Sequence, residues 1–176
     1  PEDEAIMSEF INGQQANQKL VIAPHEIKDE NIARLKKSFP GSILFSEMNE
    51  SPSAAFHQKV LIINNIGYLS RLYRYATVCY VGGGFNKSGH HNILEAAVFG
   101  KPVITGPNFH KFKESVDLKN SGGSFTVNNC TELKQVLSAM NIEAAGKIAE
   151  NYVKENGGAT DTIFKRIQEK RLFTKA

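Results

Sequence analysis

Short apolar runs alternate with amphipathic segments along the whole chain, and this alternation restricts the possible folds more than any other feature. The pattern is typical of a parallel sheet whose strands are covered on both faces by crossover helices. We therefore predict an α/β fold. The predicted strands are Lys19–Ala23, Ser42–Phe45, Val60–Ile63, Thr77–Val81, Pro102–Thr105 and Ser124–Val127.

Apolar residues between these runs recur at helical spacing and predict crossover helices. The stripes are Ile32 with Leu35, Leu69 with Leu72 and Tyr73, Ile93 with Leu94 and Ala97, and Leu133 with Val136 and Leu137. Residues 142–153 and 160–172 predict two further helices, with a hinge at Gly157-Gly158.

The first segment, residues 2–17, predicts a helix that stops at Gly13, and no strand precedes it. Either this helix opens the fold, or the strand before it belongs to a preceding part of a longer protein.

Length and charge exclude several classes of protein. The 176 residues, 41% of them hydrophobic, suffice for one sizeable core. The net charge of +3 is spread along the chain, which argues against a nucleic-acid partner. No apolar run is long enough to span a membrane, so we expect a soluble chain.

Cys79 and Cys130 have no ligand-like spacing, and we expect two unpaired, reduced thiols.

The stretch that carries most chemical information is Tyr80-Val-Gly-Gly-Gly-Phe-Asn-Lys-Ser-Gly-His-His-Asn-Ile-Leu-Glu95. A predicted strand ends at Val81, three glycines follow, and a helix is predicted to begin near His91. Glycines let a backbone approach a ligand closely, and helix N-terminal amides favour a phosphate. Ligands bind at this edge of parallel sheets. The structural alternative is a plain strand-to-helix turn.

Two common phosphate motifs are absent from this stretch. A P-loop would need Lys and Ser or Thr after its last glycine, whereas Gly89 is followed by His90. The dinucleotide fingerprint would need a glycine where Lys87 stands. Kinase and dehydrogenase activities are therefore disfavoured.

The start of the following helix offers a second candidate contact. Asn92 and Glu95 lie on one helical face, and a carboxylate there can accept hydrogen bonds from the vicinal hydroxyls of a ribose. The structural alternative is that Asn92 caps the helix and Glu95 offsets its dipole. His90, His91 and His110 lack the spacing of a metal site, so we expect no metal.

Several segments together resemble the Kdo (3-deoxy-D-manno-octulosonic acid) transferases. The signature run corresponds to Val81-Gly-Gly-Gly-Phe85, Gly89-His-His-Asn-Ile-Leu-Glu-Ala-Ala97 and Gly100-Lys-Pro-Val-Ile-Thr-Gly-Pro-Asn-Phe-His-Lys-Phe112. Upstream, Ile66-Gly-Tyr-Leu69 is similar to the family's Met-Gly-Glu-Leu segment, and Val21-Ile-Ala-Pro-His25 to its strand ending in Arg-His-Pro-Glu. The resemblance extends over residues 1–173.

The resemblance implies a GT-B glycosyltransferase, in which two Rossmann-like domains face a cleft. Residues 1–176 would form the C-terminal, CMP-sugar-binding domain, with the N-terminal acceptor domain absent. Such an enzyme moves Kdo from CMP-Kdo to a lipid A precursor in lipopolysaccharide synthesis, at the cytoplasmic face of the bacterial inner membrane. The reaction inverts the configuration at the anomeric carbon of the sugar, and the enzyme uses neither metal nor cofactor. Its partners would be CMP-Kdo, the lipid A precursor and its own N-terminal domain, but no nucleic acid.

The family's CMP contacts fall on a defined set of residues in this chain. They are His25, Ile66, Gly67, Asn92, Ile93, Leu94 and Glu95. The family's general base is a glutamate of the N-terminal domain, so we expect no catalytic residue here and no activity of the domain alone.

The chain departs from the family pattern at two positions. Pro24 replaces the family's arginine, and Tyr68 replaces its glutamate. Lys87 and Lys111 are the candidates to replace the positive charge lost at Pro24. Alternative functions are another GT-B glycosyltransferase or a sugar-nucleotide epimerase that uses a UDP-sugar, or a non-catalytic nucleotide-binding module.

Overall fold

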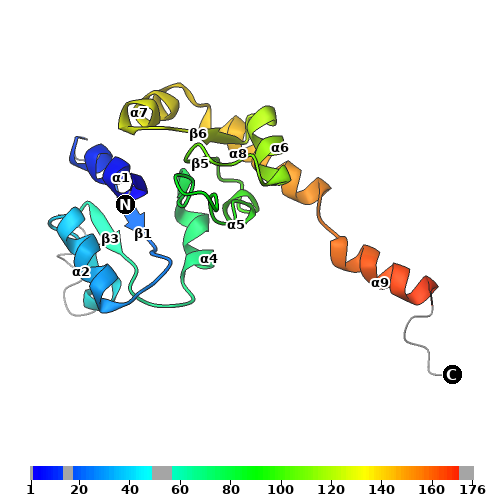
Figure 1. Ribbon diagram of the computed structural model, residues 1–176, viewed down its shortest axis with the longest axis horizontal. Helices are drawn as coiled ribbons and strands as arrows, with labels where there is room; N and C mark the ends of the chain where they lie inside the picture. Colours follow the sequence, from blue (N-terminus) through cyan, green and yellow to red (C-terminus); the bar gives the residue numbers. More distant parts are fainter. Residues whose placement is uncertain (1, 14–17, 49–56, 171–176) are drawn as a thin grey trace.

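The computed structural model describes residues 2–13, 18–48 and 57–170 (Figure 1). The helices are α1 (Glu2–Asn12), α2 (Asp29–Ser38), α4 (Leu69–Leu72), α5 (Leu94–Ala97), α6 (Lys113–Ser121), α7 (Cys130–Ala139), α8 (Ile142–Glu155) and α9 (Ala159–Glu169). The strands are β1 (Leu20–Ile22), β2 (Ile43–Leu44), β3 (Val60–Ile62), β4 (Cys79–Val81), β5 (Val103–Thr105) and β6 (Ser124–Thr126). Two 3-10 turns are η1 (Phe45–Glu47) and η2 (Tyr73–Tyr75).

Within the described residues, six strands form two parallel sheets with the orders β1-β3-β2 and β4-β5-β6. Every strand lies within its predicted range, and every pairing is parallel, as in the register of Cys79 with Val103. The α/β class is therefore confirmed. The strands divide into two hydrogen-bonded ladders, whereas the sequence predicted one parallel sheet.

The second sheet is covered on both faces, because its side chains alternate between two cores. One core joins Cys79, Val81 and Val103 to α5, α6 and α8, through Ile93, Ala96, Ala97, Leu118 and Ala149. On the other face, Ile104 packs against α1 and α7, through Ile6, Cys130 and Leu133. This sheet has the predicted layers, and Cys130 lies buried at the start of α7.

Helix α1 connects the two sheets. Ile6 belongs to the core of the second sheet, whereas Ile11 belongs to a core built with α2 and the first sheet. Figure 1 shows α1 lying between α7 and α2. As predicted, the helix ends before Gly13, whose amide donates to the carbonyl oxygens of Glu9 and Phe10. On the first sheet, α1 and α2 cover one face, while Val21 is 48% exposed.

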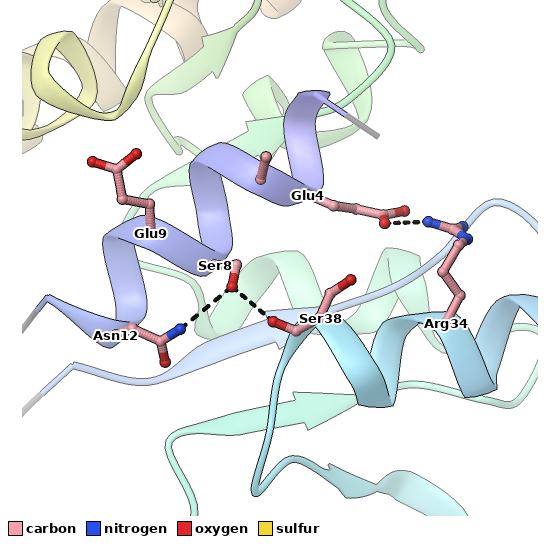
Figure 2. A pocket seen from close by; sticks show the side chains of 7 residues that line it. Glu4, Ser8, Glu9, Asn12, Arg34 and Ser38 are labelled. Carbon is pink, nitrogen blue, oxygen red and sulfur yellow. Dashed lines mark hydrogen bonds and ion pairs between the residues drawn. The ribbon is translucent and has the colours of Figure 1, made fainter.

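A pocket of about 590 Å³ lies between α1 and α2 (Figure 2). Ser8 Oγ donates to the backbone oxygen of Ser38 at 2.7 Å, and Glu4 forms an ion pair with Arg34. All of its lining residues come from these two helices, so the pocket lies apart from the loops that follow the strands.

The C-terminal part consists of α8 and α9, joined at Gly157-Gly158 as predicted. Gly158 has a φ of +84°, which glycine adopts readily. Helix α8 packs on the second sheet through Ala149, whereas α9 extends away from the body of the molecule (Figure 1). In the part of the chain that the structure describes, no helix is long and apolar enough to cross a lipid bilayer.

Candidate functional site

The candidate site lies at the carboxyl edge of the strands, where the loops after β1, β3, β4 and β5 begin. The carboxyl ends of parallel strands form the ligand-binding edge of open α/β sheets. The segments after β1, β3 and β4 contain every site residue predicted from the sequence, from His25 after β1 to Leu94 and Glu95 in helix α5.

The glycine-rich loop after β4 lies against the loop after β5. A Cβ atom on Gly84 would lie 2.6 Å from the amide nitrogen of Gly106, and a Cβ atom on Gly106 would lie 2.7 Å from the carbonyl carbon of Gly84. The amide of Asn108 donates to the carbonyl oxygen of Gly84 at 2.8 Å. Glycine at position 84 is thus required by contact between two loops, a packing reason that the sequence did not reveal.

Side chains strengthen this contact between the loops. Asn108 Nδ2 donates to the carbonyl oxygen of Asn86 at 3.1 Å, and the ammonium group of Lys111 donates to the carbonyl oxygen of Lys87. The two lysines therefore lie at the same edge, as the sequence predicted. Both are exposed, and their role as replacements for the family arginine remains a prediction.

Two histidines meet at the junction of the two sheets. His25, from the loop after β1, stacks on His91, from the loop after β4, with ring centroids 4.8 Å apart. Both side chains are exposed. Sequence reasoning included His25 in the site but gave His91 no contact. The available signal was that both residues follow strands at the same edge.

The neighbouring His90 has a different environment. Its ring is buried against Phe112, and Nδ1 lies 2.6 Å from the carbonyl oxygen of His91. The two adjacent histidine rings therefore have different surroundings, one buried against Phe112 and the other exposed against His25.

The helix after the glycine-rich loop is shorter than predicted. It begins at Leu94 and ends at Ala97, whereas the sequence predicted a start near His91. Asn92 Oδ1 accepts a hydrogen bond from the amide of Leu94 at 3.0 Å, and such local side-chain bonds compete with helical backbone bonds. The predicted alternative, that Asn92 caps the helix, is wrong, because the N-cap of α5 is Ile93 and no side chain caps it. A one-turn helix also offers little dipole to a phosphate.

The four predicted contacts in this segment differ in exposure. Ile93 is 1% exposed and Leu94 packs against the same core, so both offer only backbone atoms to a ligand. Asn92 and Glu95 are exposed, and Asn92 Nδ2 donates to Glu95 Oε1 at 3.4 Å. The carboxylate of Glu95 is thus accessible to a ligand.

The loop after β3 brings the other predicted contacts to the same edge. Ile66 is 85% exposed, and a Cβ atom on Gly67, whose φ is +89°, would meet no atom within 4 Å. Tyr68, which replaces the family glutamate, packs its ring against Phe45 with centroids 4.7 Å apart. Further along this segment, burial and the nearby charge of Glu95 raise the pKa of Tyr73 to about 12. Tyr73 also packs against the core that contains Ile93, Ala96 and Ala97, so the segment after β3 adjoins the helix that carries Glu95.

Cys79 and Cys130 are both buried free thiols, as predicted, and burial raises the pKa of Cys79 to about 11. Within residues 2–13, 18–48 and 57–170, no three His, Cys, Asp or Glu side chains are grouped so that they could hold a metal ion.

Comparisons with known proteins find sequence relatives that are Kdo transferases. No protein-family profile matches the chain. A 3-deoxy-D-manno-octulosonic acid transferase of Aquifex aeolicus is 33% identical over 124 residues, which cover 69% of this chain and 33% of that protein. The Haemophilus influenzae enzyme of the same name is 28% identical over 172 residues, 92% of this chain and 40% of that protein. The chain thus spans about a third of the length of the curated relatives it matches.

A solved structure shows the same fold. It is the crystal structure of the C-terminal CMP-Kdo binding domain of WaaA from Acinetobacter baumannii, with a TM-score of 0.70 and 21% sequence identity. The match covers 87% of this chain and 83% of that one. In sequence this chain is similar to part of the Kdo transferases, and its fold is similar to that of the solved C-terminal domain.

Proposed function

We propose that this chain is the donor-binding domain of a glycosyltransferase that transfers Kdo from CMP-Kdo to a lipid A precursor in lipopolysaccharide synthesis. The observation that carries the proposal is the convergence of separate segments on one edge. His25 stacks on His91, and Tyr73 packs against the core that contains Ile93. These contacts bring together the three segments to which the resemblance to the family assigns the CMP contacts.

Each part of a cytidine nucleotide has a matching group at this edge. The imidazoles of His25 and His91, with backbone amides of the glycine-rich loop, supply donors for the phosphate. The exposed carboxylate of Glu95 accepts hydrogen bonds from the two ribose hydroxyls. The open segment at Ile66 and Gly67 lies beside the cytosine, where Gly67 leaves space for the ring.

The transfer needs little covalent chemistry from this domain. The acceptor hydroxyl oxygen bonds to the anomeric carbon while the bond from that carbon to the CMP phosphate oxygen breaks, with inversion. Negative charge then grows on the departing phosphate, and donors that are already oriented stabilise it. The proton of the acceptor passes to a general base on the N-terminal domain. In this proposal the reaction uses no metal or cofactor, and the domain alone is inactive.

The proposal also includes where the reaction takes place and which domain binds each substrate. The full-length enzyme would act at the cytoplasmic face of the inner membrane, where a lipid A precursor presents its sugar. This domain would supply the donor side of a cleft and the N-terminal domain the acceptor side. Binding sites formed between domains are common for small ligands.

A transferase assay tests the proposal. The full-length enzyme, with CMP-Kdo and a lipid A precursor, should form Kdo-lipid A and release CMP. Glu95→Ala should lower kcat/KM about tenfold or more, because the ribose loses a charged acceptor. Glu143, another exposed glutamate in the first turn of a helix, provides the control Glu143→Ala. Absence of transfer, or equal kcat/KM for both variants, would contradict the proposal.

A further inference from the structure

The carboxylate of Asp3 connects helix α1 to the glycine-rich loop. Oδ1 accepts from the hydroxyl of Tyr80 at 2.7 Å, and Oδ2 accepts from the amide of Gly83 at 3.1 Å. Asp3 is in the first turn of α1 and lies 77 and 80 positions before these partners. Both oxygens of one half-buried carboxylate are therefore used to hold a distant strand and loop.

The peptide between Gly82 and Gly83 is held on both sides. Its N–H group donates to Asp3, while its carbonyl oxygen accepts from the amide of His91 at 3.1 Å. Because a peptide unit is planar, fixing one of these groups fixes the direction of the other. Gly83 has a φ of +93°, and glycines on either side of a peptide leave it free to rotate unless hydrogen bonds hold it.

This arrangement runs from Asp3 to the histidine pair. Asp3 orients the peptide, the peptide holds the backbone of His91, and the ring of His91 stacks on His25. Helix α1, which carries Asp3, is itself held in place, since Ile6 and Ile11 pack in the cores of both sheets.

We propose that Asp3 is a positioning residue for the nucleotide site, which orients the Gly82–Gly83 peptide and through it His91. Its part in nucleotide binding rests on the proposed function. The orienting contact itself does not, and the two parts can be measured separately.

The chain offers a set of variants that isolate the contact. Asp3→Ala removes both hydrogen bonds. Asp3→Asn keeps them, because its amide oxygen can accept from Gly83 and its NH2 group can donate to the hydroxyl oxygen of Tyr80. Glu4→Ala is the matched control, since Glu4 occupies the same helical turn but pairs with Arg34 on α2 (Figure 2).

The first measurement is NMR of the free chain, in which the amide of Gly83 and the ring protons of His25 and His91 are followed. Asp3→Ala should shift all of these signals, whereas Asp3→Asn should restore the ring signals and Glu4→Ala should leave them unchanged. The second measurement is the Kd for CMP, which should rise about tenfold in Asp3→Ala and stay within about threefold in Asp3→Asn.

The outcomes separate the two claims. Unchanged ring signals in Asp3→Ala, or a Kd that Asp3→Ala and Glu4→Ala raise equally, would overturn the positioning role. If the unaltered chain binds no CMP while the ring signals still respond to Asp3→Ala, the proposed function fails and the orienting contact stands. If Asp3→Ala does not fold, the Tyr80→Phe and Asp3→Asn variants test the positioning role of Asp3 instead. Tyr80→Phe keeps the Gly83 bond and should leave the ring signals in place, and their loss would overturn the role.

Discussion

The imidazole ring of His25 stacks on that of His91, with an angle of 12° between the ring planes. The two residues come from loops that follow β1 and β4, which belong to different sheets. The strands of the two sheets share no ladder within the described residues, so this contact joins their carboxyl edges. It places two imidazoles where the proposed phosphate binds.

The first prediction concerns this pair. His25→Ala and His91→Ala should each raise the Kd for CMP about threefold to tenfold, since each removes a donor to the phosphate. In the double variant, the Kd for CMP should rise by less than the product of the two single increases, because residues in contact are energetically coupled. Isothermal titration calorimetry measures all three values.

The control for the pair is His57→Ala. His57 is exposed and precedes β3, so it lies at the opposite edge of the first sheet, and its removal should leave CMP affinity unchanged. Full additivity of His25→Ala and His91→Ala, or an equal loss in His57→Ala, would count against the assigned role.

A second prediction follows from the contact between Gly84 and Gly106. Gly84→Ala should lower the free energy of unfolding by about 3 kcal/mol, the upper part of the range for overpacking, because the neighbouring atoms are backbone and cannot rotate away. Gly158→Ala should cost only about 1 kcal/mol, since Gly158 has a positive φ but open space around it. Urea denaturation measures both. An equal loss of unfolding free energy in Gly84→Ala and Gly158→Ala would contradict this prediction, because it would show that the two loops can separate without cost.

The third prediction concerns alkaline pH. Burial and the hydrogen bond to Asp3 hold the pKa of Tyr80 far above its ordinary value near 10. The folded chain therefore keeps a proton that the unfolded chain loses above about pH 10, so stability falls as pH rises through this range. Tyr73, with a pKa of about 12, acts in the same direction.

Removing the hydroxyl of Tyr80 should make this fall less steep. Urea midpoints for Tyr80→Phe should decline less between pH 9 and 11, a window set by the ordinary tyrosine pKa of about 10, than those of the unaltered chain. Tyr75→Phe serves as the control, since Tyr75 is 80% exposed. The assignment is wrong if the Tyr80→Phe and Tyr75→Phe variants show the same pH dependence.

The strands were predictable from the sequence because each is a short apolar run between turn residues. Thr77–Val81 and Pro102–Thr105, for example, contain β4 and β5. The helix after the glycine-rich loop was predicted too long, because its apolar stripe continues back through Ile93 while the side chain of Asn92 bonds the amide of Leu94. Periodicity does not register such a local competition.

The parts of the site that escaped prediction depend on contacts between residues far apart in the chain. The pairing of His91 with His25, of Gly84 with Gly106 and of Asp3 with Gly83 each joins separate segments. The residue types were visible in the sequence, but nothing local distinguishes an exposed His91 from a buried His90.

The central claim, that this chain binds a cytidine nucleotide at the carboxyl edge of its strands, is tested most directly by calorimetry of the chain with CMP. The account predicts saturable heat with CMP, weaker binding of UMP, and a Kd for CMP at least about tenfold higher in Glu95→Ala. Equal heats for the unaltered chain and Glu95→Ala, or binding of uridine nucleotides only, would contradict it.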